Sequence, residues 1–141
     1  LYSGRILALA ADIPNSKRLQ SPEVTVKKRS PLCGSMVTID AVFEDDTVSA
    51  FGQDVKACAL GQAAASVIGG AIIGASFTEV KQAQNALKTL LQEGGPAPLA
   101  PFDGLEALRP AKDFKNRHAS IMLSLDATVE AIEQYQSPQS G

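Results

Sequence analysis

A change in hydrophobic period near residue 58 divides the chain into two parts. Before it, Val24–Lys28, Met36–Phe43 and Thr47–Phe51 alternate apolar and polar residues, which predicts half-buried strands. After it, apolar residues recur every three or four positions, as they do in amphipathic helices. Helices that follow a sheet instead of alternating with its strands are typical of the α+β class. The sequence therefore predicts a three-stranded antiparallel sheet with helices packed on one face.

Glycine, proline and apolar spacing predict where the other elements begin and end. A short helix is expected over Tyr2–Ala11, ended by Pro14, and Glu44–Asp46 is expected to form a hairpin turn. The helices predicted after the sheet are Cys58–Gly74, Thr78–Gln92, Phe102–Leu108 (ended by Arg109-Pro110) and Lys115–Tyr135. Pro96–Pro101 is expected to be a loop.

Length and composition indicate one domain. A chain of 141 residues that is 45% hydrophobic can bury its own core without disulfide bonds. No internal repeat interrupts it. We expect a single domain over residues 1–136 and a frayed tail over 137–141.

Charge and hydropathy argue against nucleic acid and membrane partners. The net charge of −2 provides no electrostatic footprint for nucleic acid. The dense basic run Lys27, Lys28 and Arg29 is either a solvated strand edge or a docking patch for a partner protein. The longest apolar stretch, Ala63–Phe77, is shorter than the roughly 20 residues that cross a bilayer.

Two cysteines occupy dissimilar settings. Cys33 lies between Pro31 and Gly34, which mark a turn, and Cys58 lies where the helical pattern begins. Backbone N–H groups at turns and helix starts favour thiolate, the form that binds metal or accepts sulfur. Each cysteine could instead be a small buried hydrophobe, and the pair could form a disulfide. We favour free thiols in a reducing, cytoplasmic setting.

Five segments of the chain carry a resemblance to a known family. They are Pro31–Gly34, Phe51–Cys58, Ala59–Ser66, Leu105–Leu108 and Asn116–Ser120. In order and spacing they resemble the IscU/NifU-type iron-sulfur cluster assembly scaffolds, with the stretch Glu93–Pro110 similar to the insertion of the SufU branch. The resemblance covers nearly the whole chain and implies a single scaffold domain of the NifU N-terminal type.

The resemblance implies a site made of three cysteines and an aspartate that holds a [2Fe–2S] cluster or zinc, because thiolates are the ligands both select. Cys33 and Cys58 match the first two cysteines. Ser35 stands at the aspartate position and Ser120 at the third cysteine position, so two usual ligands are replaced. His118 is a further candidate ligand beside Ser120, with a surface or capping role as the alternative. We expect Cys33, Cys58, His118 and Ser120 to converge at one end of the sheet.

The function predicted from this resemblance is a scaffold for iron-sulfur cluster assembly, not an enzyme. It would bind iron, an iron-sulfur cluster or zinc through Cys33 and Cys58, as a monomer or a homodimer. Its partners would be a cysteine desulfurase and recipient apoproteins, with no nucleic acid and no membrane. Two alternatives remain open: a persulfide sulfur acceptor that serves a cysteine desulfurase, and a degenerate regulatory binding module with no metal.

Overall fold

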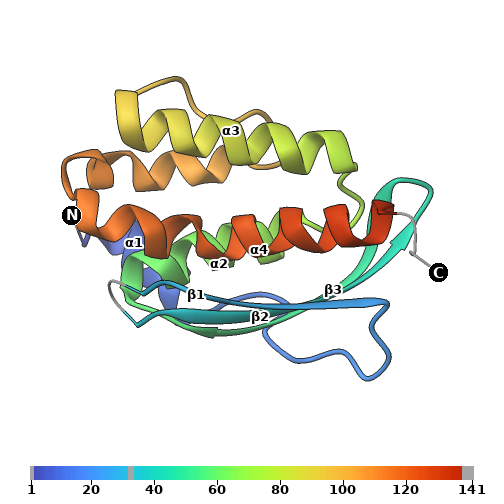
Figure 1. Cartoon of the computed structure of the whole chain (residues 1–141). Helices are drawn as coiled ribbons and strands as arrows, with labels where there is room; N and C mark the ends of the chain where they lie inside the picture. Colours follow the sequence, from blue (N-terminus) through green and yellow to red (C-terminus); the bar gives the residue numbers. More distant parts are fainter. Residues whose placement is uncertain (1, 32–33, 138–141) are drawn as a thin grey trace.

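The computed structural model describes residues 2–31 and 34–137, which form an α+β fold (Figure 1). The elements, in chain order, are α1 (Gly4–Ala11), β1 (Val24–Arg29), β2 (Met36–Glu44), β3 (Thr47–Lys56), α2 (Ala59–Ala71), α3 (Phe77–Glu93), the 3₁₀ helices η1 (Asp103–Asp113) and η2 (Lys115–Arg117), and α4 (His118–Gln136). No helix among these residues is both long and apolar enough to cross a membrane.

The three strands form an antiparallel sheet in the order β1-β2-β3, which confirms the predicted sheet. Asp45 and Asp46, with φ of 50° and 59°, make the tight turn between β2 and β3. Strand β3 continues to Lys56, beyond the predicted end at Phe51. The alternation is hidden there because the inward position is a polar residue, Gln53, which is fully buried and donates to the carbonyl of Ala65 at 3.0 Å.

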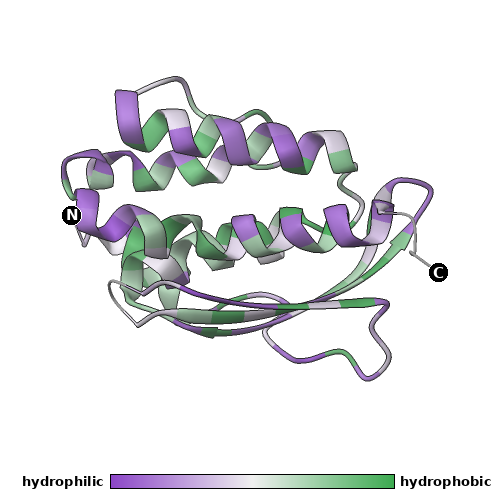
Figure 2. Cartoon of the chain, viewed as in Figure 1, coloured by the Kyte–Doolittle hydropathy of each residue, from purple (hydrophilic) through white to green (hydrophobic). Residues whose placement is uncertain are grey.

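The helices lie on one face of the sheet, with α2 and α4 next to the strands and α3 outside them (Figure 1). Figure 2 shows green, hydrophobic positions of the helices alternating with purple ones, as expected where one side of each helix is buried. The inward side chains of the sheet are buried apolar residues, namely Val26, Val37, Ile39, Ala41, Phe43, Val48 and Phe51. Burial of this continuous apolar layer fixes the helices to the sheet.

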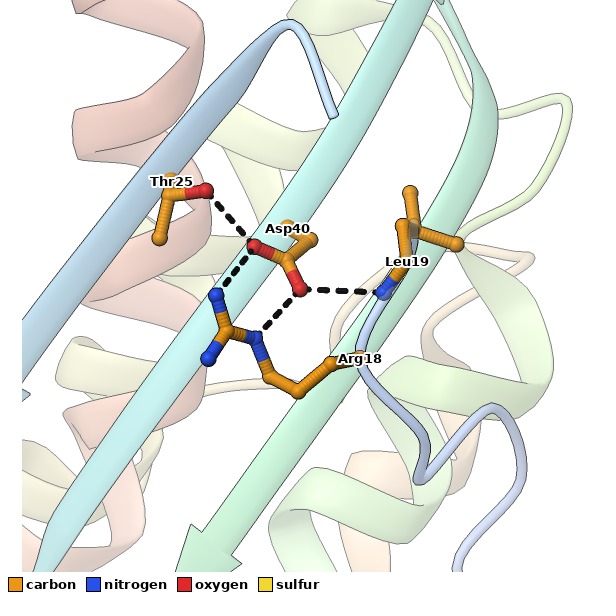
Figure 3. A network of polar contacts seen from close by, with 4 residues as sticks. All are labelled: Arg18, Leu19, Thr25 and Asp40. Atoms are coloured by element: carbon orange, nitrogen blue, oxygen red, sulfur yellow. Dashed lines mark hydrogen bonds and ion pairs between the residues drawn. The ribbon is translucent and has the colours of Figure 1, made fainter. Parts of the chain in front are cut away.

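The opposite, outer face of the sheet is partly covered by the connector of residues 12–23 (Figure 1). Gly52 allows this close approach, because a Cβ there would lie 2.2 Å from the Lys17 carbonyl oxygen. Asp40, at the adjacent outward position of β2, is fully buried beneath the connector. Its carboxylate accepts hydrogen bonds from Arg18, the Leu19 amide and Thr25 (Figure 3). We call these four residues the Asp40 cluster.

One predicted helix end is wrong. Arg109-Pro110 does not end the segment after the proline-rich loop, because η1 continues through Pro110 to Asp113. Leu105, Leu108 and Ala111 are fully buried at intervals of three residues, which is the repeat of a 3₁₀ helix. Packing of this face on both sides of the proline holds the segment together. The predicted tail lies outside the described residues from 138 onward.

Candidate functional site

Three segments that are distant in sequence meet at one end of the sheet: the turn before β2, the start of α2 and the start of α4 (Figure 1). The first two are neighbours because β2 begins opposite the end of β3, with Met36 paired to Lys56. Ser35 directly precedes Met36 in this last pair of the sheet, and Cys58 follows Lys56 by two residues. The α4 helix, which packs on α2, brings Ser120 to the same place.

Ser35, Cys58 and Ser120 are in contact, and we call them the Cys58 cluster. The Ser35 and Ser120 hydroxyls lie 2.9 Å apart, and both residues are buried. The Ser120 hydroxyl lies 3.5 Å from the Cys58 sulfur, which is partly exposed and carries a free thiol. The two serines predicted at ligand positions are therefore side by side, and one of them touches the cysteine.

Cys58 is the N-cap residue of α2, so its sulfur lies near the unpaired amides of the first helical turn. Burial raises the pKa of the thiol, but hydrogen bonding from Ser120, from the Gly61 and Leu60 amides and from Arg117 lowers it further than burial raises it. The net pKa of Cys58 lies below its ordinary value. Although the uncharged thiol makes no capping hydrogen bond, these donors favour the thiolate.

The first turn of α2 leaves no space between the helix and Ser120. A Cβ at Gly61 would lie 2.6 Å from the Ser120 hydroxyl oxygen and 2.9 Å from the Ala57 side chain. Such distances are far inside van der Waals contact, so a glycine is required for α4 to approach this closely. Gly61 thus sets the position of the Ser120 hydroxyl relative to Cys58.

The turn before β2 is closed by backbone hydrogen bonds. The Ser30 amide donates to the Ser35 carbonyl at 2.8 Å, and the Gly34 amide donates to the Ser30 carbonyl at 3.0 Å. Gly34 has φ of 69°, a left-handed conformation that favours glycine, as its place in a turn predicts. Cys33 lies outside the described residues, so its predicted ligand role stays a prediction.

His118, the first residue of α4, is held by the end of η1. Its Nε2 lies 3.0 Å from the carbonyl oxygens of both Ala111 and Lys112. Carbonyl oxygens only accept, so Nε2 carries the proton and donates to them. A ligand role for His118, which stays a prediction, would therefore use Nδ1.

The described part of the chain contains no group of three histidine, cysteine, aspartate or glutamate side chains placed to hold a metal ion. The separation of the Cys58 sulfur and the Ser120 oxygen is nevertheless compatible with two donors to one ion. Two sulfurs bound to one zinc at 2.3 Å in a tetrahedron lie about 3.8 Å apart, close to the 3.5 Å between Cys58 Sγ and Ser120 Oγ. A cysteine at position 120 would thus place its sulfur within reach of a shared ion.

Two contributors to the site were not predicted from the sequence. The first is Arg117, which lowers the pKa of Cys58, whereas the sequence pointed to its neighbour His118 as a candidate ligand. Its position three residues before Ser120 indicates a shared side of a helix end, which is the signal that could have identified it. Gly61 was visible only as one of several small residues of α2, because its role depends on the approach of α4.

Comparison with known proteins identifies solved structures that share this fold. No family model matches the sequence, and no curated protein sequence matches it significantly. Among solved structures, the N-terminal part of a NifU-like protein from Brucella abortus, described as nitrogen-fixing, is 38% identical, with a TM-score of 0.93 and 96% of each chain covered.

A second solved structure shares the fold at lower identity. It comes from the thermophilic Fervidobacterium islandicum AW-1 and is described as a candidate iron-sulfur cluster assembly scaffold protein for the SUF system, SufU. It is 19% identical, with a TM-score of 0.81, covering 93% of this chain and 96% of its own. On the identity and coverage of the Brucella structure, the chain belongs to the IscU/NifU-type family of iron-sulfur cluster assembly scaffolds.

Proposed function

We propose that this chain acts as a scaffold in iron-sulfur cluster assembly and binds iron, a cluster or zinc through Cys33 and Cys58. The observation that carries the proposal is the Cys58 cluster: a thiol with a lowered pKa lies 3.5 Å from the Ser120 hydroxyl, which lies 2.9 Å from that of Ser35, and the resemblance assigns these two serines to the remaining ligand positions. Thiolates are the ligands that iron and zinc select among the groups present.

Each residue of the cluster has a distinct part in this proposal. Cys58 supplies a thiolate at a helix N-terminus, where the amides of α2 stabilise negative charge. The Ser120 hydroxyl donates to that sulfur and the Ser35 hydroxyl supports Ser120. Hydroxyls are poor ligands for iron and zinc, so the cargo would be held by fewer soft donors than in a four-ligand site. A weakly held cluster suits a protein that must release it to a recipient apoprotein.

Sulfur transfer is the second candidate, and the exposure and lowered pKa of Cys58 favour it. The Cys58 thiolate would attack the outer sulfur of a persulfide on a cysteine desulfurase. A sulfur–sulfur bond forms on Cys58, the sulfur–sulfur bond of the donor breaks, and the donor cysteine leaves as thiolate. No other oxidant or reductant is needed, and Ser120 would donate to the new persulfide.

Anaerobic purification of the parent chain and of Cys58→Ser, followed by iron, zinc and acid-labile sulfide analysis, tests the two candidates. Iron with sulfide, or zinc, in the parent and its loss in Cys58→Ser supports the scaffold. A metal-free parent whose Cys58 gains one sulfur from a desulfurase, seen by mass spectrometry, supports sulfur transfer. A parent that takes up neither contradicts both candidates. Ser49→Ala, which changes an exposed serine of β3, is the control for metal or sulfide lost during purification of a variant.

A further inference from the structure

Positively charged side chains flank the Cys58 cluster on both faces of the sheet. Arg29 and Lys56 lie opposite the same residue, Met36, in the last row of the sheet, so both point outward beside the site. Both are exposed. On the helical side, the partly exposed Arg117 is the N-cap residue of α4, three residues before Ser120, whose hydroxyl lies 3.5 Å from the Cys58 sulfur. We call Arg29, Lys56 and Arg117 the cationic rim.

The rim is not neutralised by neighbouring carboxylates. Within the described residues three ion pairs form, Arg18 with Asp40, Lys28 with Glu130 and Arg109 with Glu106, and none involves a rim residue. The outward residue of β3 nearest to Lys56 is the acidic Asp54. Lys27 of β1 lies in the same row of the sheet, because both residues pair with Thr38. The local charge is therefore positive in a chain whose net charge is −2.

The connector leaves this part of the outer face open. Near this end of the sheet it contacts Gly52, Gln53 and Asp40, and Gly52 lies four residues before Lys56 on β3. Basic residues on β1 and β3 also guard exposed strand edges against aggregation. That role does not explain Arg117, which lies in η2 on the other side of the site. The feature the three residues share is their position around Cys58.

We propose that the cationic rim is the docking surface for an acidic segment of a partner protein, which it holds with the Cys58 cluster facing the partner. The inference rests on the proposed function, since a sulfur donor or a cluster recipient must bring its own thiols to Cys58. A net negative chain repels an acidic partner in most orientations. A local positive rim therefore selects the productive one and speeds encounter.

A synthetic peptide of alternating glutamate and glycine tests the rim without any partner identified. Titration into labelled parent protein at low ionic strength, followed by amide NMR, is expected to shift signals of Ser30, Lys56 and Ala57. Arg29→Glu/Lys56→Glu should weaken the affinity about tenfold, because complementary charges become repulsive. The control Lys81→Glu/Lys88→Glu makes the same charge change on α3 and should stay within about twofold of the parent.

A control peptide with glutamine in place of every glutamate carries no charge and should bind more weakly. Four results would overturn the inference: equal weakening by the two double variants, shifts confined to other surfaces, no binding of the glutamate peptide, or equal binding of the glutamine control peptide. Tripolyphosphate that binds the rim as tightly as the peptide would also overturn it and assign a site for free anions. The outcome is separate from the proposed function. If the rim binds the peptide but the chain takes up neither metal nor sulfur, the docking surface is supported and the scaffold function is contradicted.

Discussion

The Asp40 cluster and the Cys58 cluster both place a polar group under the surface of the sheet, but they differ in how completely that group is satisfied. Asp40 is fully buried and its two carboxylate oxygens accept four hydrogen bonds, between 2.6 and 3.1 Å (Figure 3). Cys58 is partly exposed, and its side chain lies 3.5 Å from the Ser120 hydroxyl, a longer contact than any of the four to Asp40.

The difference indicates what each cluster does. A carboxylate with every acceptor position used has no capacity left for a ligand, so the Asp40 cluster fastens the connector to the sheet. A thiol with a lowered pKa and open coordination can exchange its hydroxyl partner for a metal or a sulfur atom. The first cluster stabilises the fold, and the second is available for chemistry.

The largest predicted effect is on stability, from Asp40→Asn. Loss of the charge that Arg18, Leu19 and Thr25 share should lower the free energy of unfolding by about 2–3 kcal/mol, measured by urea unfolding. Asp54→Asn, at an exposed outward position of β3, should change it by less than about 0.5 kcal/mol. Equal effects of the two changes would remove the structural role of the Asp40 cluster.

The Asp40 effect should depend on pH in a stated direction. Burial raises the pKa of Asp40, but hydrogen bonds from Arg18, Thr25 and the Leu19 amide, with the Arg18 charge, lower it below its ordinary value. The stabilisation is therefore complete above the unfolded pKa, about 3.9, and is lost as pH falls through the folded pKa. The stability difference between parent and Asp40→Asn should shrink over that acidic range. A difference that stays constant into acid would contradict this account.

Gly61→Ala should disturb the Cys58 cluster while Gly70→Ala, on the same helix, should not. The added methyl at position 61 collides with Ser120, which should cost about 1–3 kcal/mol. At position 70 the nearest atom outside the helix, Pro14 Cγ, is 3.6 Å away, so alanine should be neutral or stabilising by up to about 1 kcal/mol. Similar unfolding midpoints for the two variants would mean that α2 and α4 are not in close contact at Ser120.

The reactivity of Cys58 should follow its lowered pKa. Because more thiolate is present near neutral pH, iodoacetamide should alkylate Cys58 faster than a free cysteine, with Cys33 resolved separately by peptide mass spectrometry. Ser120→Ala removes a donor to the thiolate, so the pKa should rise and the rate near pH 7 should fall about fivefold. If the alkylation rate of Cys58 depends on pH in the same way in Ser120→Ala as in the parent, the Ser120 hydroxyl does not lower the pKa of Cys58.

The smallest effect is expected from Ser35→Ala. Ser35 contacts Ser120 and is one hydrogen bond further from the sulfur, so the alkylation rate of Cys58 should fall only about twofold. The same assay checks it. A larger effect than that of Ser120→Ala would reverse the order of the two serines in this account.

The sequence predicted the elements whose apolar period is regular and missed features that depend on contacts between distant segments. The three strands and the four main helices follow from alternation and from three-to-four spacing. The end of β3 at Lys56 was not predicted, because the inward position there is a polar residue, Gln53, whose side-chain amide donates to the Ala65 carbonyl of α2. Nor was the continuation of η1 through Pro110, which is fixed by packing of Leu105, Leu108 and Ala111.

The same limit applies to the candidate site. Cys58 at a helix start was predicted from a local pattern, and the resemblance placed Ser35 and Ser120 at the same site. That the two hydroxyls hydrogen bond to each other depends on how α4 packs against α2 at Gly61, which no local pattern contains. The proton of His118 donates to η1 carbonyls, a contact set by the same tertiary packing.

Zinc binding by the parent and by Ser35→Asp/Ser120→Cys tests the central claim most directly, that the Cys58 end of the sheet is a ligand site with two positions replaced. Competition against a zinc chelator at neutral pH should show weak binding by the parent and stoichiometric binding, at least about tenfold tighter, by the variant, since it restores three thiolates and a carboxylate. Equal zinc affinity of the two proteins, or a folded variant that binds no zinc, would contradict the claim.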